Sequence, residues 1–145
     1  ALYNSTNGPA WTHHENWLEN GMPCTWYGVE CMERGHVVAL ALGANQLSGL
    51  IPAEIGNLKN LWNLWLHDNH LTGPIPPEMG GLSSLVNLEA GGNLLTGSIP
   101  AELGDLSNLE RLNIGASQLT GGIPVESRFP RCTRSKKRSR ISGSN

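Results

Sequence analysis

The sequence predicts an α/β repeat solenoid, in which short coils of similar sequence stack side by side around one apolar core. Three observations lead to this fold class. The triplet Leu-Ser-Gly at 47–49 returns as Leu-Thr-Gly at 71–73, 95–97 and 119–121, each time after 24 residues. Apolar residues keep the same places between the triplets, as is typical of solenoids. The 145 residues include 18 Gly and 9 Pro but are only 15% charged, which disfavours a helical bundle and a disordered chain.

Residues 1–36 precede the first repeat and differ from it in composition. They hold three of the five Trp, both Tyr and two of the three Cys. The first coil of a solenoid exposes its apolar cross-section, and an aromatic segment before it is the expected cover. We therefore predict that residues 1–36 form an N-terminal cap, built on Trp11, Trp17, Trp26 and Tyr27.

Two short motifs in the predicted cap carry chemistry. Asn4-Ser5-Thr6 is an acceptor sequence for N-glycosylation at Asn4, which would make the protein a glycoprotein. His13-His14-Glu15 has metal-ligating side chains, but adjacent residues on one strand or helix point apart. A solvated loop is the better interpretation of that segment, and no metal site is predicted.

Four repeat units follow the predicted cap, and within each unit apolar residues alternate at its start. Such alternation predicts a short strand with one buried face, and stacked coils turn these strands into a parallel sheet. The proline after each triplet ends a second short segment and leaves room for one helical turn. The units are 37–60, 61–84, 85–108 and a partial unit, 109–124.

An asparagine recurs where the chain leaves each predicted strand, at Asn45, Asn69 and Asn93. A buried amide at this turn both donates and accepts, so it satisfies backbone groups that the turn leaves unpaired. We predict a ladder in which each asparagine bonds one coil to the next. Ser117 takes this place in the last unit, so the ladder weakens towards the C-terminal end.

The repeats resemble the plant-type leucine-rich repeat, L-x-x-L-x-L-x-x-N-x-L-S/T-G-x-I-P, from residue 37 to about residue 124. This resemblance implies a right-handed solenoid. Its parallel sheet lines the concave face, a second short strand lies at the Leu-Thr-Gly position, and 3₁₀ turns form the convex side.

The segment Pro-Cys-Thr-Trp-Tyr-Gly-Val-Glu-Cys resembles the cysteine cap at the N-terminus of receptor-like kinase ectodomains. The opening of the chain is also similar to algal and bacterial leucine-rich-repeat proteins. The cap resemblance implies a disulfide between Cys24 and Cys31, and hence an extracellular or cell-surface location. The alternative is a pair of buried thiols in a cytoplasmic protein.

The final segment, 125–145, abandons the repeat and is predicted to be a disordered tail. Residues 1–127 carry a formal charge of −9 and residues 128–145 carry +7, so the body of the protein does not bind nucleic acid. Two other interpretations of the tail stay open: a nuclear-localisation or anion-binding tract, and a truncated gene end. Cys132 in the tail is either a free thiol or pairs outside the sequence.

Motifs of catalysis are missing from the sequence. It has no G-x-S-x-G, no P-loop, no kinase lysine or catalytic loop, and no H-E-x-x-H. We therefore expect no enzyme activity from these residues and no cofactor; any kinase activity would belong to further parts of the gene product. No run of 18 apolar residues occurs, so no transmembrane segment is predicted in the chain.

The candidate binding residues lie on the outward face of the predicted strands. The first coil offers only small residues there, Val38, Ala39, Ala41, Gly43 and Ala44. The second coil presents two Trp and a His, and large exposed aromatics flanked by polar groups mark recognition sites. The alternative is that the Trp rings simply cover the small residues of the first coil. The predicted site consists of Trp62, Asn63, Trp65, His67, Asp68, Asn87, Glu89, Glu110, Arg111 and Asn113.

Taken together, these features predict a monomeric, non-catalytic recognition module that binds a protein or peptide on its concave face. A glycan ligand stays open. The resemblance implies a role in a receptor or in signal transduction. Two alternatives remain: a structural spacer in a cell-surface protein, and a fragment of a receptor-like kinase ectodomain.

Overall fold

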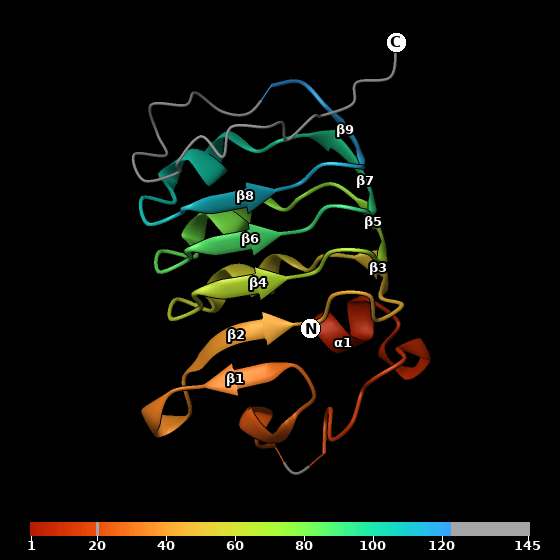
Figure 1. Ribbon diagram of the computed structural model, residues 1–145, viewed down its shortest axis with the longest axis vertical. Helices are drawn as coiled ribbons and strands as arrows, with labels where there is room; N and C mark the ends of the chain where they lie inside the picture. The colour runs from red at the N-terminus through yellow and green to blue at the C-terminus, as the bar shows by residue number, and fades with distance from the viewer. Residues whose placement is uncertain (20, 123–145) are drawn as a thin grey trace.

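The computed structural model describes residues 1–19 and 21–122, which form a stack of coils (Figure 1). One strand of each coil contributes to a five-stranded sheet that runs the length of the stack. Four of its strands are parallel, while the first pairs antiparallel with the second. In sheet order the strands are β1 Val29–Cys31, β2 Val37–Ala41, β4 Asn63–Trp65, β6 Asn87–Glu89 and β8 Arg111–Asn113.

A second parallel sheet lies at the Leu-Ser/Thr-Gly positions, as the resemblance implies. Its first bend shows why glycine is needed there. Gly49 has φ +103°, and the carbonyl of Ser5 in the cap lies where a side chain would be. In order, the strands of this sheet are β3 Ser48–Leu50, β5 His70–Gly73, β7 Leu94–Ser98 and β9 Gln118–Thr120.

Single 3₁₀ turns on the convex side follow the prolines, which act as N-caps. Lys59 links two of these turns, because its Nζ donates to the carbonyls of Gly56 at 2.9 Å and Gly81 at 2.8 Å. Two coils thus share one ammonium group. The turns are η4 Ala53–Asn57, η5 Pro77–Gly81 and η6 Ala101–Asp105.

The core is one column of aliphatic side chains between the two sheets and the turns. Each coil contributes the same positions, so neighbouring coils bury one another's faces. The inward residues of the strands illustrate this, since Leu40, Leu64 and Leu88 are all buried. At about 1.5–3 kcal/mol for each such side chain, burial is the main stabilising force.

Asn69 shows how the asparagine ladder joins coils. Its Oδ1 accepts hydrogen bonds from the N–H groups of Asn45 and Leu47 in the preceding coil, at 2.9 and 3.0 Å. Its Nδ2 donates to the carbonyls of Leu42 in the preceding coil and Leu66 in its own, at 2.8 and 2.9 Å. The side chain is buried, and it replaces the water that these backbone groups would otherwise need.

The ladder differs at its two ends. Asn45 bonds to the cap, because its Oδ1 accepts from the His13 N–H and its Nδ2 donates to the His13 carbonyl. Asn93 again bridges two coils, through the Leu71 N–H and the Leu66 carbonyl. Within residues 1–122, the Ser117 hydroxyl donates only inside its own coil, to Ile114 at 2.9 Å.

The cap covers the N-terminal end of the column with a cluster of aromatic rings. Trp11 and Trp17 are buried and meet edge to face at 4.9 Å, and Tyr3 stacks on Trp17 at 5.9 Å. Trp26 is half-buried, and Tyr27 is more exposed. Outside β1, the cap contains α1 Leu2–Ser5, η1 Gly8–Ala10, η2 Pro23–Thr25 and η3 Glu33–Gly35.

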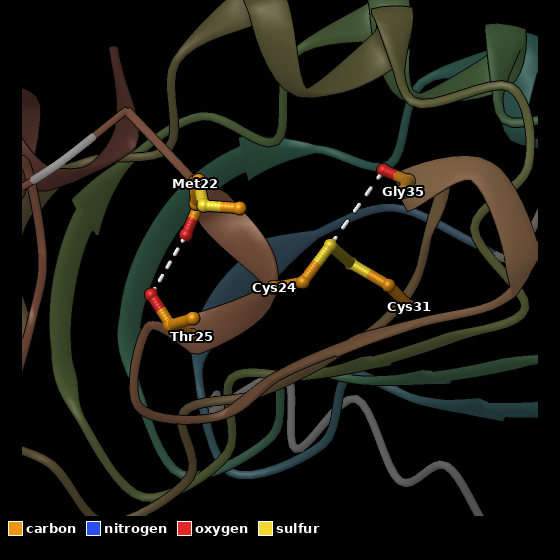
Figure 2. The surroundings of a disulfide bond; sticks show 5 residues. All are labelled: Met22, Cys24, Thr25, Cys31 and Gly35. Atoms are coloured by element: carbon orange, nitrogen blue, oxygen red, sulfur yellow. Dashed lines mark hydrogen bonds between the residues drawn. A yellow bond between two sulfur atoms is a disulfide. The ribbon is translucent and has the colours of Figure 1, made fainter.

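Figure 2 shows the disulfide between Cys24 in η2 and Cys31 in β1, whose Cα atoms are 5.5 Å apart. The Thr25 hydroxyl donates to the Met22 carbonyl at 2.9 Å and closes the adjoining turn. Cys24 Sγ also lies 3.8 Å from the Gly35 carbonyl; this is only a contact, because a disulfide sulfur carries no proton. The bond ties η2 of the cap to β1, the strand that extends the concave sheet.

The structure corrects one expectation about the first coil. Val38 and Ala39, expected on the outward face, are buried, with exposures of 9% and 0%. The cause is β1, which pairs with one side of β2, so that Ala39 lies between Glu30 and Asn63. The predicted tail at 125–145, including Cys132, lies outside the described residues. In the described part of the chain, no helix is long and apolar enough to cross a membrane.

Candidate functional site

The concave sheet has two rows of positions on its outer face, because alternate residues of each strand share a face, and only Ala39 among them is buried. One row runs from the small Ala39 to Arg111, through two asparagines, and the other runs from the small Ala41 to Asn113, through Trp65 and Glu89. Neighbours within a row are register partners on adjacent strands. The rows are Ala39, Asn63, Asn87, Arg111 and Ala41, Trp65, Glu89, Asn113.

In the first row, Asn63 and Asn87 are joined side chain to side chain. Asn87 Nδ2 donates to Asn63 Oδ1 at 2.5 Å, and both residues are half-buried. Each amide keeps a second polar atom, Asn63 Nδ2 and Asn87 Oδ1, which is one donor and one acceptor. A peptide group carries the complementary donor and acceptor, so this pair suits an extended backbone.

The two tryptophans differ in exposure. Trp62, just before β4, is 46% exposed, which is high for so large an apolar side chain. Trp65 in β4 is half-buried beside Ala41. Trp65 is therefore partly covered on the sheet, whereas much of Trp62 stays in solvent.

His67 and Asp68 follow β4 and form one polar unit, with His67 Nδ1 at 3.1 Å from Asp68 Oδ2. The His67 ring lies over Gly43 of the preceding coil, where a side chain would collide with it. Asp68 leans towards the next coil, where its Oδ1 occupies the space beside Gly92. Glycines on both sides thus fix this pair on the concave face.

Glu110 and Arg111 lie at the far end of the sheet, in or just before β8, and both are exposed. Asn113 is occupied locally, because its Oδ1 accepts from the Gly115 N–H at 3.2 Å. The structure therefore groups Trp62 to Asp68 with Asn87 and Glu89 around β4 and β6. It places the remaining three predicted residues one strand further along.

Sequence reasoning missed Gly43 as part of the site, treating it only as a small outward residue. The available signal was its place 24 residues before His67, which makes the two neighbours in the stacked coils. The repeat therefore shows that Gly43 and His67 are neighbours. That the His67 ring lies over Gly43 follows only from the structure.

His13 and Glu15 lie close together in the cap. His13 Nδ1 lies 3.4 Å from Glu15 Oε1 on an exposed loop, and no cluster of three His, Cys, Asp or Glu side chains occurs in residues 1–19 and 21–122. A hydrogen bond from its own backbone N–H, aided by His13 and His14, lowers the pKa of Glu15.

Comparisons with known proteins agree with this geometry. The profile of the Leucine Rich Repeat family matches residues 60–82. The LRR receptor-like serine/threonine-protein kinase FEI 2 of Arabidopsis thaliana is 42% identical over 52 residues, or 35% of this chain and 9% of that protein. A second relative, a probable LRR receptor-like serine/threonine-protein kinase of the same plant, is 38% identical over 56 residues, and the match covers 37% of this chain. The chain thus spans only 9% and 8% of the length of these two relatives.

Solved structures match over more of the chain. A chain of the BIR3–SERK2 complex from Arabidopsis thaliana has a TM-score of 0.74 and 32% identity, and the match covers 92% of this chain and 73% of that one. A chain of the complex of the Arabidopsis receptor kinase HAESA with the peptide hormone IDA and the co-receptor SERK1 has a TM-score of 0.67 and 33% identity, and the match covers 79% of this chain and 19% of that one. The stacked coils, whose repeat strands pair in parallel in both sheets, and these matches show that the chain belongs to the plant-type leucine-rich-repeat family.

Proposed function

We propose that this chain is a non-catalytic recognition module that binds an extended peptide, or an extended segment of a protein, on its concave face. The observation that carries the proposal is the surface around β4 and β6. There a large exposed tryptophan, a half-buried tryptophan and a bonded asparagine pair lie together. Aromatic anchors supply contact area, and amides supply hydrogen bonds to a peptide backbone.

The comparisons support a receptor context. HAESA is a receptor kinase solved with a peptide hormone and a co-receptor, and FEI 2 is a receptor-like kinase. By analogy, the chain would serve as part of a receptor ectodomain, where a partner protein or peptide is the ligand. The Cys24–Cys31 bond supports an extracellular or cell-surface location, because disulfides persist in oxidising compartments.

The test compares the parent protein with a Trp62→Ala/Trp65→Ala double variant. Peptides that bind the parent are first selected from a displayed library of short random sequences. We expect the double variant to lose at least about tenfold in affinity for them, since buried aromatic anchors are each worth 1 kcal/mol or more, on the order of 2. Circular dichroism and urea unfolding show whether the variant is folded.

A matched control replaces an apolar residue of similar exposure on the other sheet, Leu50→Ala. This variant should bind like the parent. If the double variant also binds like the parent, the concave face is not the binding site. A library that yields no saturable binder at all would favour the structural-spacer role instead.

A further inference from the structure

We propose that the concave site selects ligands that present a basic side chain, arginine or lysine, to the pair formed by Trp65 and Glu89. The inference rests on the proposed function and specifies the chemistry of the ligand. Trp65 and Glu89 are register partners on β4 and β6, so both side chains rise from the same face. The strands that carry them are about 4.8 Å apart.

An indole beside a carboxylate is a good receptor for a flat or compact cation. The face of a Trp ring attracts a guanidinium or ammonium group within about 6 Å of its centre. The neighbouring carboxylate then accepts a charge-assisted hydrogen bond from the same group. On the other side of Trp65, its register partner on β2 is the small Ala41. Both Trp65 and Glu89 are half-buried, which strengthens the attraction by removing part of the water.

Glu89 has no cation of its own in the described part of the chain. The ion pairs there join His13 to Glu15 and His67 to Asp68, and the register partner of Glu89 on β8 is the neutral Asn113. The carboxylate is therefore available to a ligand.

The charge of the surrounding residues is also negative, like that of Glu89. Residues 1–122 contain eleven acidic side chains and three basic ones. Of the basic three, Lys59 is bound on the convex side, Arg34 lies in η3 of the cap, and Arg111 lies on β8, with β6 between it and Trp65. Asp68, on the coil of Trp65, adds another negative charge next to His67. Such a distribution attracts cationic partners and disfavours acidic ones.

The neighbouring row, with Asn63 and Asn87, can bind the backbone of the same ligand. Asn63 and Asn87 lie two residues before Trp65 and Glu89 on the same strands. A peptide that places its basic side chain against Trp65 brings its backbone over the two amides. The site therefore fits an extended basic peptide better than a free cation, which would make no use of the amides.

This chain offers one competing occupant of its own. Residues 128–140 hold seven of its ten basic side chains. A synthetic peptide of these residues belongs in the test as a competitor. Displacement of the selected peptides that depends on Glu89 would support the charge selection, whereas a failure of this strongly basic peptide to compete would contradict it.

The experiment uses the full chain and the selected peptides. We expect the peptides to share an arginine or lysine, and the affinity of one of them to fall about tenfold in Glu89→Gln, which removes the charge and keeps the shape. Replacing the basic residue of that peptide by citrulline or glutamine should cost a similar factor in the parent protein and little more in Glu89→Gln. This non-additivity, measured by calorimetry, assigns the contact to that pair. Glu54→Gln on the exposed convex side is the matched control and should change nothing.

The possible failures are distinct. Peptides that need Trp65 but share no basic residue, or that bind Glu89→Gln as tightly as the parent, would overturn the charge selection and leave the proposed function intact. Peptides whose binding is unaffected by both Trp62→Ala/Trp65→Ala and Glu89→Gln would overturn the proposed function and this inference together.

Discussion

At the scale of single residues, Gly43 is the platform on which the His67 ring lies. Gly43→Ala places a methyl group where the ring now is, and a contact that close forces one partner to move. Since His67 is partly exposed, the ring should swing away at a cost of about 1 kcal/mol or less. We expect the His67 resonances to shift in a histidine-edited NMR spectrum and the contact with Asp68 to be lost.

Gly122→Ala is the control for this change, because no atom of the described residues lies within 4 Å of a Cβ at that position. It should leave the His67 resonances in place. An unchanged His67 spectrum in Gly43→Ala would mean that the ring does not rest on the first coil in solution.

Asn69 is a second residue whose role is testable, through its bonds to two coils. Asn69→Ala leaves the N–H groups of Asn45 and Leu47 unpaired, together with the carbonyl of Leu42. An unsatisfied buried group costs about 1–3 kcal/mol, and water enters part of the space, so we expect a loss of about 3 kcal/mol in the free energy of unfolding. Urea unfolding followed by circular dichroism measures this loss.

The exposed Asn60 provides the comparison for Asn69. Asn60→Ala should change stability by less than about 0.5 kcal/mol, as is usual for surface substitutions. Equal effects of the two substitutions would show that the ladder does not stabilise the stack.

At the scale of elements, the disulfide controls β1. A Cys24→Ser/Cys31→Ser variant opens a loop with a sequence separation of 7 residues, and the chain-entropy relation assigns about 2–3 kcal/mol to a loop of this size. The effect should be local, because β1 is three residues long and lies at the edge of its sheet. We expect faster hydrogen exchange at the amides of β1 and unchanged exchange in β6. Equal loss of protection in both strands would mean that the cap and the repeats unfold as one unit.

The elements also show what the sequence alone could predict. The repeat predicts β2 to β9, the 3₁₀ turns η4 to η6 and the glycine bends, because equivalent positions have the same structural role in every coil. It carries no information on β1. Val29–Cys31 has neither a repeat partner nor a run of alternation long enough to predict a strand, and its antiparallel pairing depends on how the cap folds back onto β2. The burial of Ala39 follows from that pairing and was missed for the same reason.

The candidate site also has some features that the sequence predicts and others that only the structure shows. Its rows follow from the period, so Trp65 beside Glu89 and Asn63 beside Asn87 were predictable as neighbours. The hydrogen bond between the two amides and the position of His67 over Gly43 depend on rotamers chosen by packing. Period alone cannot select among staggered rotamers, which is why exposure at these positions came only from the structure.

At the scale of the whole molecule, stability in a stack of coils is the sum of contacts between neighbours. The first coil is fastened to the cap by aromatic packing and by Asn45, and the middle coils by Asn69 and Asn93. In the described residues, the last coil has only the Ser117 hydroxyl at this position, bonded within its own coil. Of the described coils, the one that holds β8 and β9 should therefore open first, and hydrogen exchange should be fastest in these two strands.

Ser117→Asn tests this order of unfolding by placing an asparagine at the ladder position of the last described coil. By analogy with Asn93, whose Nδ2 reaches Leu66 and whose Oδ1 reaches Leu71, the new amide would bond to Ala90 and Leu95 one coil back. Two added hydrogen bonds between coils are worth about 1–2 kcal/mol, so exchange in β9 should slow while that in β4 changes little. If Ser117→Asn stabilises nothing, and β4 exchanges as fast as β9 in the parent, then the coils open together and the ladder does not set the order of unfolding.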